Sequence, residues 1–348
     1  KIHHMCGDGS TLIRWLQAGY NQSPIDVGFV PVWAMNRTQK KYNKVPWFKA
    51  VFGGLWGFLM AVKDLTWIWF RLFLKLLRIN KDYMPLPFTG TKTVLTGQVK
   101  KGHAVATLDI DFKRIKILSQ RLRASVNEVM LCVFDIAVHR QLVDYGQTFE
   151  KALYTNMPIN LRRPGETTYG NKIAIVPVEL AHGHTDPYLR LREIIENHRK
   201  VKKAAKASHP ASFSYYTLLI QSYAIMFEML GLSSWVKPIA NILVSNMPGP
   251  ADVMYFKDSQ LLAFYPISTI TPGGGVNFTM VTYNGQANIG LVCCNNNIDS
   301  LEPLAAYCLD AFDILEKCID DPSININDVG KEINKEFVST ANDKVFTS

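Results

Sequence analysis

The sequence predicts an α/β fold in which strands and helices interleave around a mixed sheet. Strand-like segments with apolar side chains recur at 152–158, 172–180 and 241–246. Asn284-Gly285, a dipeptide favoured in type I′ turns, joins two more such segments, 276–283 and 286–294, as a hairpin. Segments with apolar residues at helical spacing separate the strands, which indicates α/β architecture.

The first predicted helix covers residues 10–21. Its cap is Ser10 or Thr11, because a hydroxyl oxygen can accept a hydrogen bond from a backbone N–H of the first turn. The apolar residues of this helix are Leu12, Ile13, Trp15 and Leu16.

Residues 46–79 form the most apolar stretch and predict helices rich in Trp, Phe and Leu. The longest uncharged run, Ala50–Val62, has 13 residues, fewer than the roughly 20 that a helix needs to cross a bilayer. Two interpretations remain open. Tryptophans flanked by Lys and Arg are typical of helices that lie at a membrane interface, whereas a pair of buried helices with charged ends fits the same pattern.

A segment rich in Pro, Gly, Thr and Lys, residues 81–102, is predicted to be an interdomain linker that crosses the surface. After it, Thr107–Asp111 alternates polar and apolar residues as a strand does, and a helix is predicted from Phe112. The inward residues of that helix are Ile115, Leu118 and Leu122.

The next predicted helix opens with Ser125 and Glu128 at the spacing of a capping box, in which each side chain bonds the other residue's backbone N–H. Its inward residues are Val129, Val133, Ile136 and Ala137. A last helix, at 301–319, has apolar residues at the same helical spacing, namely Leu301, Leu304, Cys308, Phe312, Leu315 and Ile319.

The formal net charge of +9 favours anionic partners such as the phosphates of coenzyme A or acidic lipid headgroups. Nucleic acid is not an expected partner, because no recognition motif is present and the basic residues are dispersed apart from one run. That run, Arg190–Lys206, is interpreted as the solvated face of a helix. The alternative is a contact with coenzyme A phosphates or a membrane surface.

The six cysteines form neither a disulfide framework nor Cys-x-x-Cys metal spacing. The adjacent Cys293 and Cys294 cannot bridge without strain. Reduced thiols in a cytoplasmic protein are therefore predicted. No signal peptide precedes the first motif, and the chain begins inside that motif without an initiator Met, so we expect an N-terminally truncated fragment.

The most informative motif is a His-His-x-x-x-Asp-Gly string formed by His3, His4, Asp8 and Gly9. Neighbouring residues on a strand or loop point in different directions, so one imidazole can face a cavity while the other is held by the protein. Histidine is also the side chain best suited to accept a proton near pH 7. The string therefore indicates acid–base chemistry.

Three other interpretations compete with acid–base chemistry. Each histidine could be structural. Two His plus Asp could bind a metal, although no second cluster of His, Cys and Asp occurs at ligand spacing, so no metal is expected. Cys6, two residues after His4, could be a thiol nucleophile, but it fills a variable position of the string.

Two further strings follow predicted strands: Met-Pro-Ile-Asn-Leu-Arg-Arg-Pro-Gly at 157–165 and Ser-Asn-Met-Pro-Gly-Pro at 245–250. Together with His3-His4-x-x-x-Asp8-Gly9 and the helix start at 126–129, they resemble the wax ester synthase/diacylglycerol acyltransferase (WS/DGAT) family of the CoA-dependent acyltransferase superfamily. Motif order and spacing agree over essentially the whole chain. One departure is Glu128, where the family usually has Asp.

The resemblance implies a two-domain, chloramphenicol acetyltransferase-like fold with mixed sheets, the first domain being incomplete in this chain. Residues 1–80 are then the remainder of the N-terminal acyltransferase domain, with the catalytic loop and apolar helices, and residues 81–102 are the linker. Residues 103–330 are the C-terminal acyltransferase domain, and residues 331–348 are a tail.

The resemblance also implies transfer of a fatty acyl group from acyl-CoA to a long-chain alcohol or diacylglycerol, in a ternary complex and without a cofactor. His4, next to His3, is then the general base. Asn127, at a helix N-terminus, is the expected donor to the thioester oxyanion. Asp8 is expected to shape the catalytic loop through an ion pair with Arg162 or Arg163.

Three more residues are expected at the substrate. Gly9 permits a sharp exit of the chain from the motif. Ser245 and Asn246 line the channel between the domains, or else form only a turn at a strand end. Glu128 is explained by the capping box, which we prefer to a catalytic role.

The expected partners are acyl-CoA, a fatty alcohol or diacylglycerol, and the surface of a membrane or lipid droplet, to which a cytoplasmic enzyme binds peripherally. Two rival functions remain: the same fold acting on an amine or a small hydroxyl acceptor, and a catalytically silent lipid-binding fragment. The apolar 46–79 stretch and the 245–250 string favour a lipid acceptor. The intact His3-His4-Asp8 string argues against a silent protein.

Overall fold

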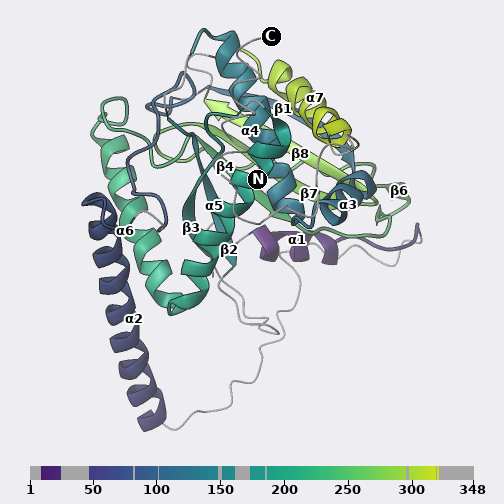
Figure 1. Cartoon of the computed structure of the whole chain (residues 1–348). Coiled ribbons are helices and arrows are strands. Elements are labelled where there is room, and N and C mark those ends of the chain that lie inside the picture. Colours follow the sequence, from purple (N-terminus) through teal and green to yellow (C-terminus); the bar gives the residue numbers. More distant parts are fainter. Residues whose placement is uncertain are drawn as a thin grey trace.

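The centre of the molecule is a six-stranded mixed sheet in the order β1-β8-β7-β4-β2-β3 (Figure 1). The computed structural model describes residues 9–24, 47–80, 83–100, 102–147, 151–160, 173–184, 186–294, 298–318 and 320. The sheet strands are β1 (His103–Asp111), β2 (Tyr154–Asn160), β3 (Ile173–Glu179), β4 (Ile242–Met247), β7 (Val276–Tyr283) and β8 (Gln286–Cys294). The helices are α1 (Gly9–Ala18), α2 (Trp47–Leu76), α3 (Phe112–Arg121), α4 (Val126–Asp144), α5 (Pro187–Ala207), α6 (Pro210–Met229) and α7 (Glu302–Cys318).

The sheet is mixed because β4 runs parallel to both of its neighbours, β2 and β7, while the other pairings are antiparallel. The predicted hairpin of β7 and β8 is confirmed with its bounds. Asn284 and Gly285 both take positive φ angles, 45° and 77°, as a type I′ turn requires. A separate two-stranded ribbon consists of β5 (Tyr255–Phe256) and β6 (Ser259–Gln260).

Helix α4 lies at the centre of the helical layer, packed against α3, α5 and α7. The ring of Phe134 stacks on Phe278 of β7 with centroids 4.4 Å apart, which anchors the helix to the sheet. The predicted inward residues Val129, Val133 and Ala137 are fully buried. Other faces of α4 are buried as well, because neighbouring helices surround it.

Helix α6 covers the edge of the sheet beside β3. The Thr217 hydroxyl accepts from the Ile175 N–H at 3.0 Å and donates to the Ile175 carbonyl at 3.1 Å. Covering an edge strand in this way removes a template for unwanted strand pairing. No helix was expected here. The reason is that apolar residues lie both on the buried side, as Phe213 does, and on the exposed side, as Leu218 does, so no amphipathic period marks the segment.

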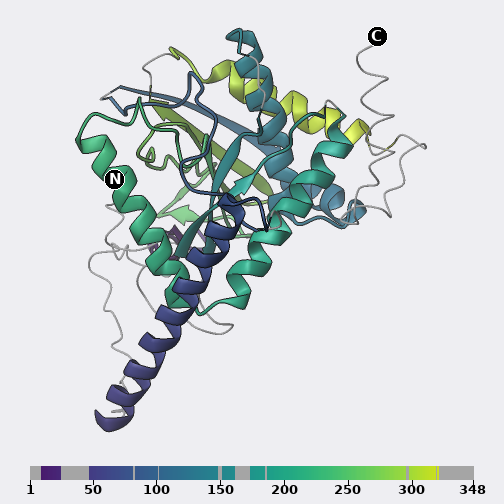
Figure 2. The ribbon, with the colours of Figure 1, turned by 60° about the vertical axis from the view of Figure 1, so that its left-hand side comes forward.

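Helix α2 is one continuous helix of 30 residues, not a pair of helices. Its buried residues Ala61, Ile68 and Leu72 follow helical spacing, and the helix packs along α6. Asp64, a charged residue within this apolar helix, accepts the backbone N–H of His209 at the start of α6, at 2.7 Å. The N-terminal half of α2 projects beyond the remainder of the described chain (Figures 1 and 2). No described helix is long and apolar enough to cross a bilayer.

The segment between α2 and β1 is held tightly to the rest of the molecule. Tyr83, Met84 and Leu95 are buried within it. The Gly97 N–H donates to the Gly273 carbonyl at 2.8 Å, and the Val99 N–H donates to the Glu228 carboxylate of α6 at 2.6 Å. A segment that resembles a surface linker in composition is therefore partly buried.

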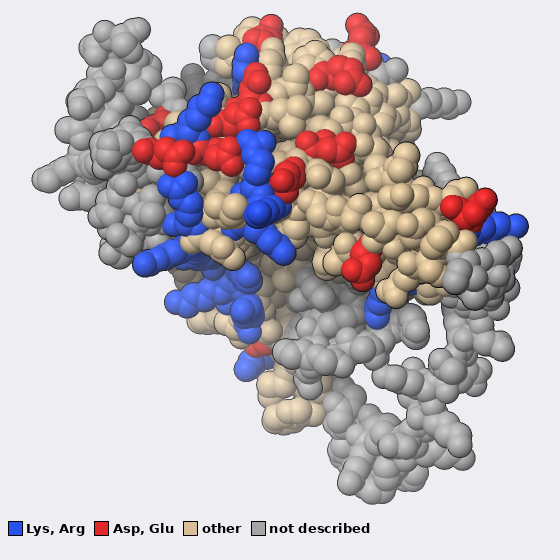
Figure 3. Space-filling model, turned by 90° about the vertical axis from the view of Figure 1, so that its right-hand side faces the viewer, with Lys and Arg blue, Asp and Glu red and all other residues tan. Residues whose placement is uncertain are grey.

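The face seen from the right of Figure 1 carries basic and acidic side chains close together (Figure 3). Ion pairs join α3 to α7, where Arg114 contacts Asp313 at 2.7 Å and Glu316 at 2.6 Å. Among the described cysteines, Cys132, Cys293 and Cys308 are buried free thiols, in line with the predicted thiols.

Candidate functional site

The structure describes four of the predicted site residues, namely Gly9, Asn127, Ser245 and Asn246. His3, His4 and Asp8 lie outside the described residues, as do Arg162 and Arg163. Among the residues that are described, no three His, Cys, Asp or Glu side chains gather as a metal site.

Asn127 and Asn246 meet although 119 residues separate them in sequence. Asn127 is the second residue of α4, and Asn246 is the penultimate residue of β4. The Nδ2 of Asn246 donates to the Oδ1 of Asn127 at 2.7 Å. This bond uses the acceptor of the Asn127 amide and does not involve its two N–H donors. Two separate strings of the sequence thus form one polar site.

The end of β4 contacts a second helix through Met247. Side chains alternate along a strand, so Asn246 lies on the face of β4 shared with Val244, and Met247 lies on the other face. A Cβ on Gly9 would come within 1.9 Å of the Met247 sulfur, so the start of α1 lies directly against the Met247 side chain. Gly9 is not among the glycines with a positive φ. Its observed role is this close approach.

Two helix N-termini therefore lie at the end of β4, that of α4 on one face and that of α1 on the other. The first backbone N–H groups of a helix have no partner within the helix, and the helix dipole adds a partial positive charge there. Helix α1 begins at Gly9, so Ser10 and Thr11 lie in its first turn and are not its cap, contrary to the prediction. The partial positive charge beside the Asn127–Asn246 pair is that of α4 alone.

The turn after β4 is fixed by Gly249. A Cβ at this position would lie 2.2 Å from the Thr282 carbonyl oxygen, which leaves no room for any other residue without backbone movement. The Gly249 N–H donates to the Thr282 hydroxyl at 3.1 Å. These contacts hold the end of β4 against β7, so Ser245 and Asn246, both partly buried, have a fixed support.

Glu128 holds the N-terminus of α4 in place. The capping box is confirmed: the Ser125 N–H donates to the Glu128 carboxylate at 2.7 Å, and the Glu128 N–H donates to the Ser125 hydroxyl at 3.3 Å. Glu128 is only 3% exposed. Its carboxylate also accepts from His198 Nδ1 at 2.8 Å and Arg199 Nε at 3.4 Å, both on α5.

The charge of Glu128 is maintained despite its burial. Burial acts to raise the pKa of this carboxyl, but hydrogen bonds from His198 and Ser125 outweigh it and lower the pKa to about 2. An ionised Glu128 then fastens α4 to α5, and Asn127 is the adjacent residue. The structural role preferred for Glu128 is supported, and it extends to positioning Asn127.

The interpretation of Arg190–Lys206 as a solvated face is wrong for half of the run. Lys202, Lys203 and Lys206 are exposed, but Arg190, Arg192 and His198 are buried. The contact of His198 with Glu128 was missed because a histidine within a basic run has no local signal that shows its partner, which lies 70 residues away.

Arg190 forms a buried ion pair with Asp135 of α4. Its Nε donates to the Asp135 carboxylate at 3.0 Å, and its Nη1 donates to the His184 carbonyl at 2.5 Å. His139 Nδ1 lies 3.0 Å from the other Asp135 oxygen. Nearby Glu193 has its pKa raised to about 7, chiefly by burial, with Asp135 among the further causes. This cluster stabilises the α4–α5 contact from within.

Comparison with known sequences identifies relatives. A family model described as the WS/DGAT C-terminal domain matches residues 169–316. "O-acyltransferase WSD" of Acinetobacter baylyi is 23% identical over 322 residues, covering 92% of this chain and 70% of that protein. A Mycobacterium tuberculosis protein named for diacylglycerol O-acyltransferase activity is 28% identical over 227 residues, 64% of this chain. That match spans only 45% of the relative's length.

Solved structures share the fold. A "wax ester synthase/diacylglycerol acyltransferase from Marinobacter aquaeolei VT8" superposes with a TM-score of 0.62 at 19% identity, covering 91% of this chain and 67% of that one. The starter condensation domain of rhizomide synthetase RzmA superposes with a TM-score of 0.50 at 12% identity, covering 93% of this chain and 66% of that one. The predicted mixed α/β fold of this class is confirmed.

Proposed function

This chain belongs to the wax ester synthase/diacylglycerol acyltransferase family, and from that premise we propose that it is an acyl-CoA-dependent O-acyltransferase. The acceptor is the hydroxyl group of a long-chain alcohol or of diacylglycerol. One observation carries the proposal furthest. Asn127 at the start of α4 is paired with Asn246, and Gly9, the last residue of the His-His-x-x-x-Asp-Gly string, lies against the next residue of β4.

The reaction needs a base because an alcohol is a poor nucleophile. His4 takes the hydroxyl proton as the alcohol oxygen attacks the thioester carbon, which contributes roughly 10²–10⁴-fold. The C–S bond then breaks, the coenzyme A thiolate leaves, and protonated His4 returns the proton to it. The bond made is an ester and the bond broken is a thioester. No covalent acyl-enzyme and no cofactor are required.

Asn127 is the donor to the oxyanion that forms on the thioester oxygen. Its Oδ1 is occupied by Asn246, so the amide is oriented, and an Nδ2 hydrogen serves as the donor. The N-terminus of α4 adds the favourable end of the helix dipole. A pre-oriented donor of this kind is worth about 10²–10³-fold in kcat. Asn246 is then a positioning residue that sets the orientation of the Asn127 amide.

Asp8 and Ser245 have supporting roles in this proposal. Asp8 shapes the catalytic loop through an ion pair with Arg162 or Arg163, and His3 is held by the protein beside the base. Ser245, partly buried one residue before Asn246, lines the substrate channel. Gly9 brings the start of α1 against the Met247 side chain of β4.

We further propose that the enzyme associates peripherally with a membrane or lipid droplet, where its insoluble substrates collect. The supporting observation is the outer surface of α2. Trp56 is 64% exposed, Phe58 is 56% exposed and Trp67 is 54% exposed. Large aromatic residues on a helix near Lys and Arg are typical of interfacial binding. Trp69 of the same helix does not belong to this surface, since its ring packs against Tyr216 with centroids 5.9 Å apart.

The test is an acceptor screen with the full-length protein. Acyl-CoA is supplied with a fatty alcohol, diacylglycerol, a long-chain amine or a short alcohol, and products are identified by mass spectrometry. We expect esters with the lipid alcohols, and a fall in kcat of at least about a hundredfold for His4→Ala with the fold retained. Amide products would favour the rival acceptor class. Near-normal activity of a folded His4→Ala variant would contradict the mechanism.

A further inference from the structure

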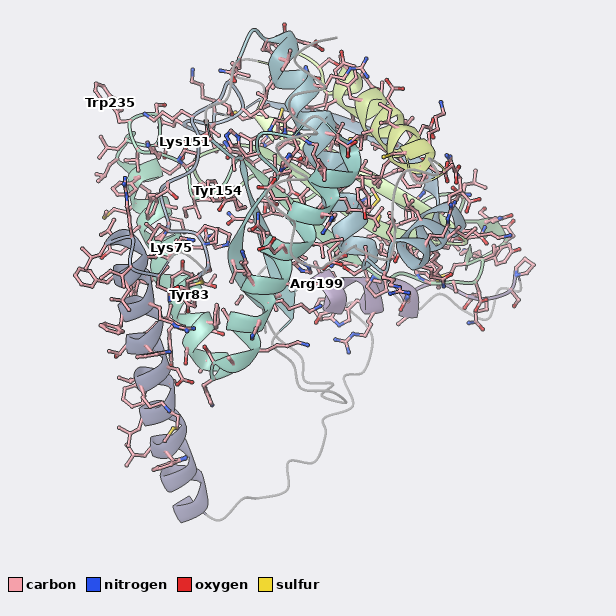
Figure 4. All side chains as sticks on the ribbon, in the orientation of Figure 1. Lys75, Tyr83, Lys151, Tyr154, Arg199 and Trp235 are labelled. Atoms are coloured by element: carbon pink, nitrogen blue, oxygen red, sulfur yellow. The ribbon has the colours of Figure 1, made fainter. Side chains whose placement is uncertain are left out.

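A cavity of about 280 Å³ opens between the end of α2, the start of β2 and the end of β3. Its polar lining consists of Lys75, Lys151, Lys237, Tyr154, Glu179 and Thr89. Figure 4 shows Lys75, Lys151 and Tyr154 grouped on the α2 side of the molecule, apart from Arg199 near the start of α4. We propose that this cavity binds the phosphate-bearing headgroup of an anionic phospholipid.

The charges in the cavity select an anion. Among the described residues that line the cavity, three carry ammonium groups and one, Glu179, carries a carboxylate. Lys75 is partly buried and donates to the Tyr83 carbonyl at 2.6 Å, which fixes its position. Lys151 and Lys237 are exposed at the mouth, where they can close on a phosphate.

The neutral groups of the cavity add hydrogen-bonding capacity. Burial, followed by the charge of Glu179, raises the pKa of Tyr154 to about 12, although a bond with Thr89 acts in the opposite direction. Tyr154 therefore keeps its phenolic hydrogen at neutral pH and can donate it to a phosphate oxygen. The cavity is slightly smaller than the roughly 300–1,000 Å³ of sites for drug-sized ligands. That size suits a headgroup and excludes a whole lipid.

The cavity is distinct from the catalytic end of the sheet. Tyr154 is the first residue of β2, and the neighbouring Thr155 is paired with Ile242, the first residue of β4. Asn246 lies four residues further along β4, about 13 Å away at the rise of a strand. The proposed headgroup site and the Asn127–Asn246 site thus lie toward opposite ends of the same strands.

Exposed apolar residues adjoin the basic groups. Leu76 and Leu77 directly follow Lys75 at the end of α2, and Ile79 after them is 70% exposed. Trp235, two residues before Lys237, is 82% exposed. Basic groups beside exposed Leu, Ile and Trp match an anionic bilayer, whose headgroups meet the lysines while its acyl chains meet the apolar side chains. A soluble phosphate would account for the lysines alone.

This inference rests on the proposed membrane association, and its test separates the two. The full-length protein is sedimented with vesicles of phosphatidylcholine alone, and with vesicles that contain one-third phosphatidylglycerol. We expect the double variant Lys151→Gln/Lys237→Gln to lose roughly ten- to thirtyfold in affinity for the anionic vesicles. Its affinity for neutral vesicles should be unchanged, because α2 still provides the apolar contact.

The matched control is Lys202→Gln/Lys203→Gln on α5, which removes the same charge from exposed positions elsewhere. We expect less than a twofold effect from it on the anionic vesicles. Equal losses in both double variants would overturn the headgroup site, since diffuse charge would then explain binding. A second outcome would also overturn the headgroup site in favour of a soluble ligand. In that outcome, inorganic phosphate or glycerol 3-phosphate stabilises the folded protein only when Lys151 and Lys237 are present, and the protein shows no preference for anionic vesicles. If the unaltered protein fails to bind neutral vesicles but keeps the lysine-dependent binding to anionic ones, the α2 proposal fails and the headgroup site stands.

Discussion

Asn246 of β4 donates its amide hydrogen to the Oδ1 of Asn127 at 2.7 Å, and thereby orients a side chain at the N-terminus of α4. The next residue of each string has a structural role: Glu128 fastens α4 to α5, and Met247 contacts Gly9. The pair of amides therefore links the central helix to the central parallel strand, and the next residue of that strand contacts Gly9 of the His-His-x-x-x-Asp-Gly string.

Replacing Asn127 by Asp should separate orientation from catalysis. A carboxylate keeps the acceptor that Asn246 requires but lacks the N–H donor needed at the oxyanion. We expect Asn127→Asp to lower kcat by about 10²–10³-fold while the melting temperature stays close to that of the unaltered protein. Steady-state kinetics with acyl-CoA and a fatty alcohol, together with thermal unfolding, measure both effects.

The control for this substitution is Ser125→Ala, two residues earlier. It removes the capping hydroxyl and should cost about 1 kcal/mol of stability with little change in kcat. The opposite pattern, with normal kcat in Asn127→Asp and loss of kcat in Ser125→Ala, would make the whole helix start structural.

Glu128→Gln should reduce stability in a pH-dependent manner. The folded pKa of Glu128 is lowered to about 2 from a reference value of 4.5, so its contribution is fully present above the reference pKa and is lost as pH falls through the folded pKa. The difference in unfolding free energy between the two proteins should therefore be largest near neutral pH and shrink between about pH 4.5 and 2.

Denaturant unfolding at several pH values measures this difference. Glu302→Gln is the matched control, because Glu302 also lies in the first turn of a helix but is exposed; we expect an effect within about 0.5 kcal/mol. A deficit for Glu128→Gln that is the same at every pH would show that ionisation of this carboxyl is not involved.

Breaking the buried Asp135–Arg190 pair should be costly. Asp135→Asn leaves Arg190 buried without a countercharge, which we expect to cost about 3–5 kcal/mol of unfolding free energy. The double variant Asp135→Leu/Arg190→Met should recover most of this loss, since apolar groups need no partner there. The exposed pair Arg140–Asp310, at 2.9 Å, is the control: Asp310→Asn should cost no more than about 1 kcal/mol. Equal costs at the two sites would refute the buried-pair explanation.

The aromatic surface of α2 should bind membranes without contributing to the core. We expect Trp56→Ser/Phe58→Ser/Trp67→Ser to release the protein from phosphatidylcholine vesicles, with little change in melting temperature and with activity on a short, soluble alcohol retained. High salt should weaken vesicle binding of the unaltered protein only partly, because screening leaves apolar burial intact. Trp69→Ser is the contrasting variant and should lower the melting temperature, since Trp69 packs on Tyr216. Early melting or aggregation of the triple variant would place its aromatic residues in the core.

Local signals in the sequence predicted several elements closely. The β7–β8 hairpin follows from Asn284-Gly285, whose backbone preferences act within the turn itself. The capping box of Ser125 and Glu128 likewise depends on residues three positions apart. Such features can be predicted without knowledge of the tertiary structure, because the interacting groups are neighbours along the chain.

Other features of the chain were not predicted because no local pattern represents them. Helix α6 has apolar residues all around, since one side covers β3 and the other is exposed. The basic run from Arg190 gave no sign that Arg190 would be buried, because its partner Asp135 lies 55 residues away. Burial of a charge depends on which helices pack together, and helical periodicity alone does not encode that.

By itself, the sequence determined the fold class and the family resemblance, and its strings gave Asn127, Ser245 and Asn246 as candidate site residues. Only the tertiary structure decided that Asn127 and Asn246 form one hydrogen-bonded pair, that Glu128 is held by α5, and that Gly9 closes against Met247. The physical reason is the range of each interaction. Propensity and periodicity act over a few residues, whereas these contacts form when the sheet order brings the end of β4 to the N-termini of α4 and α1.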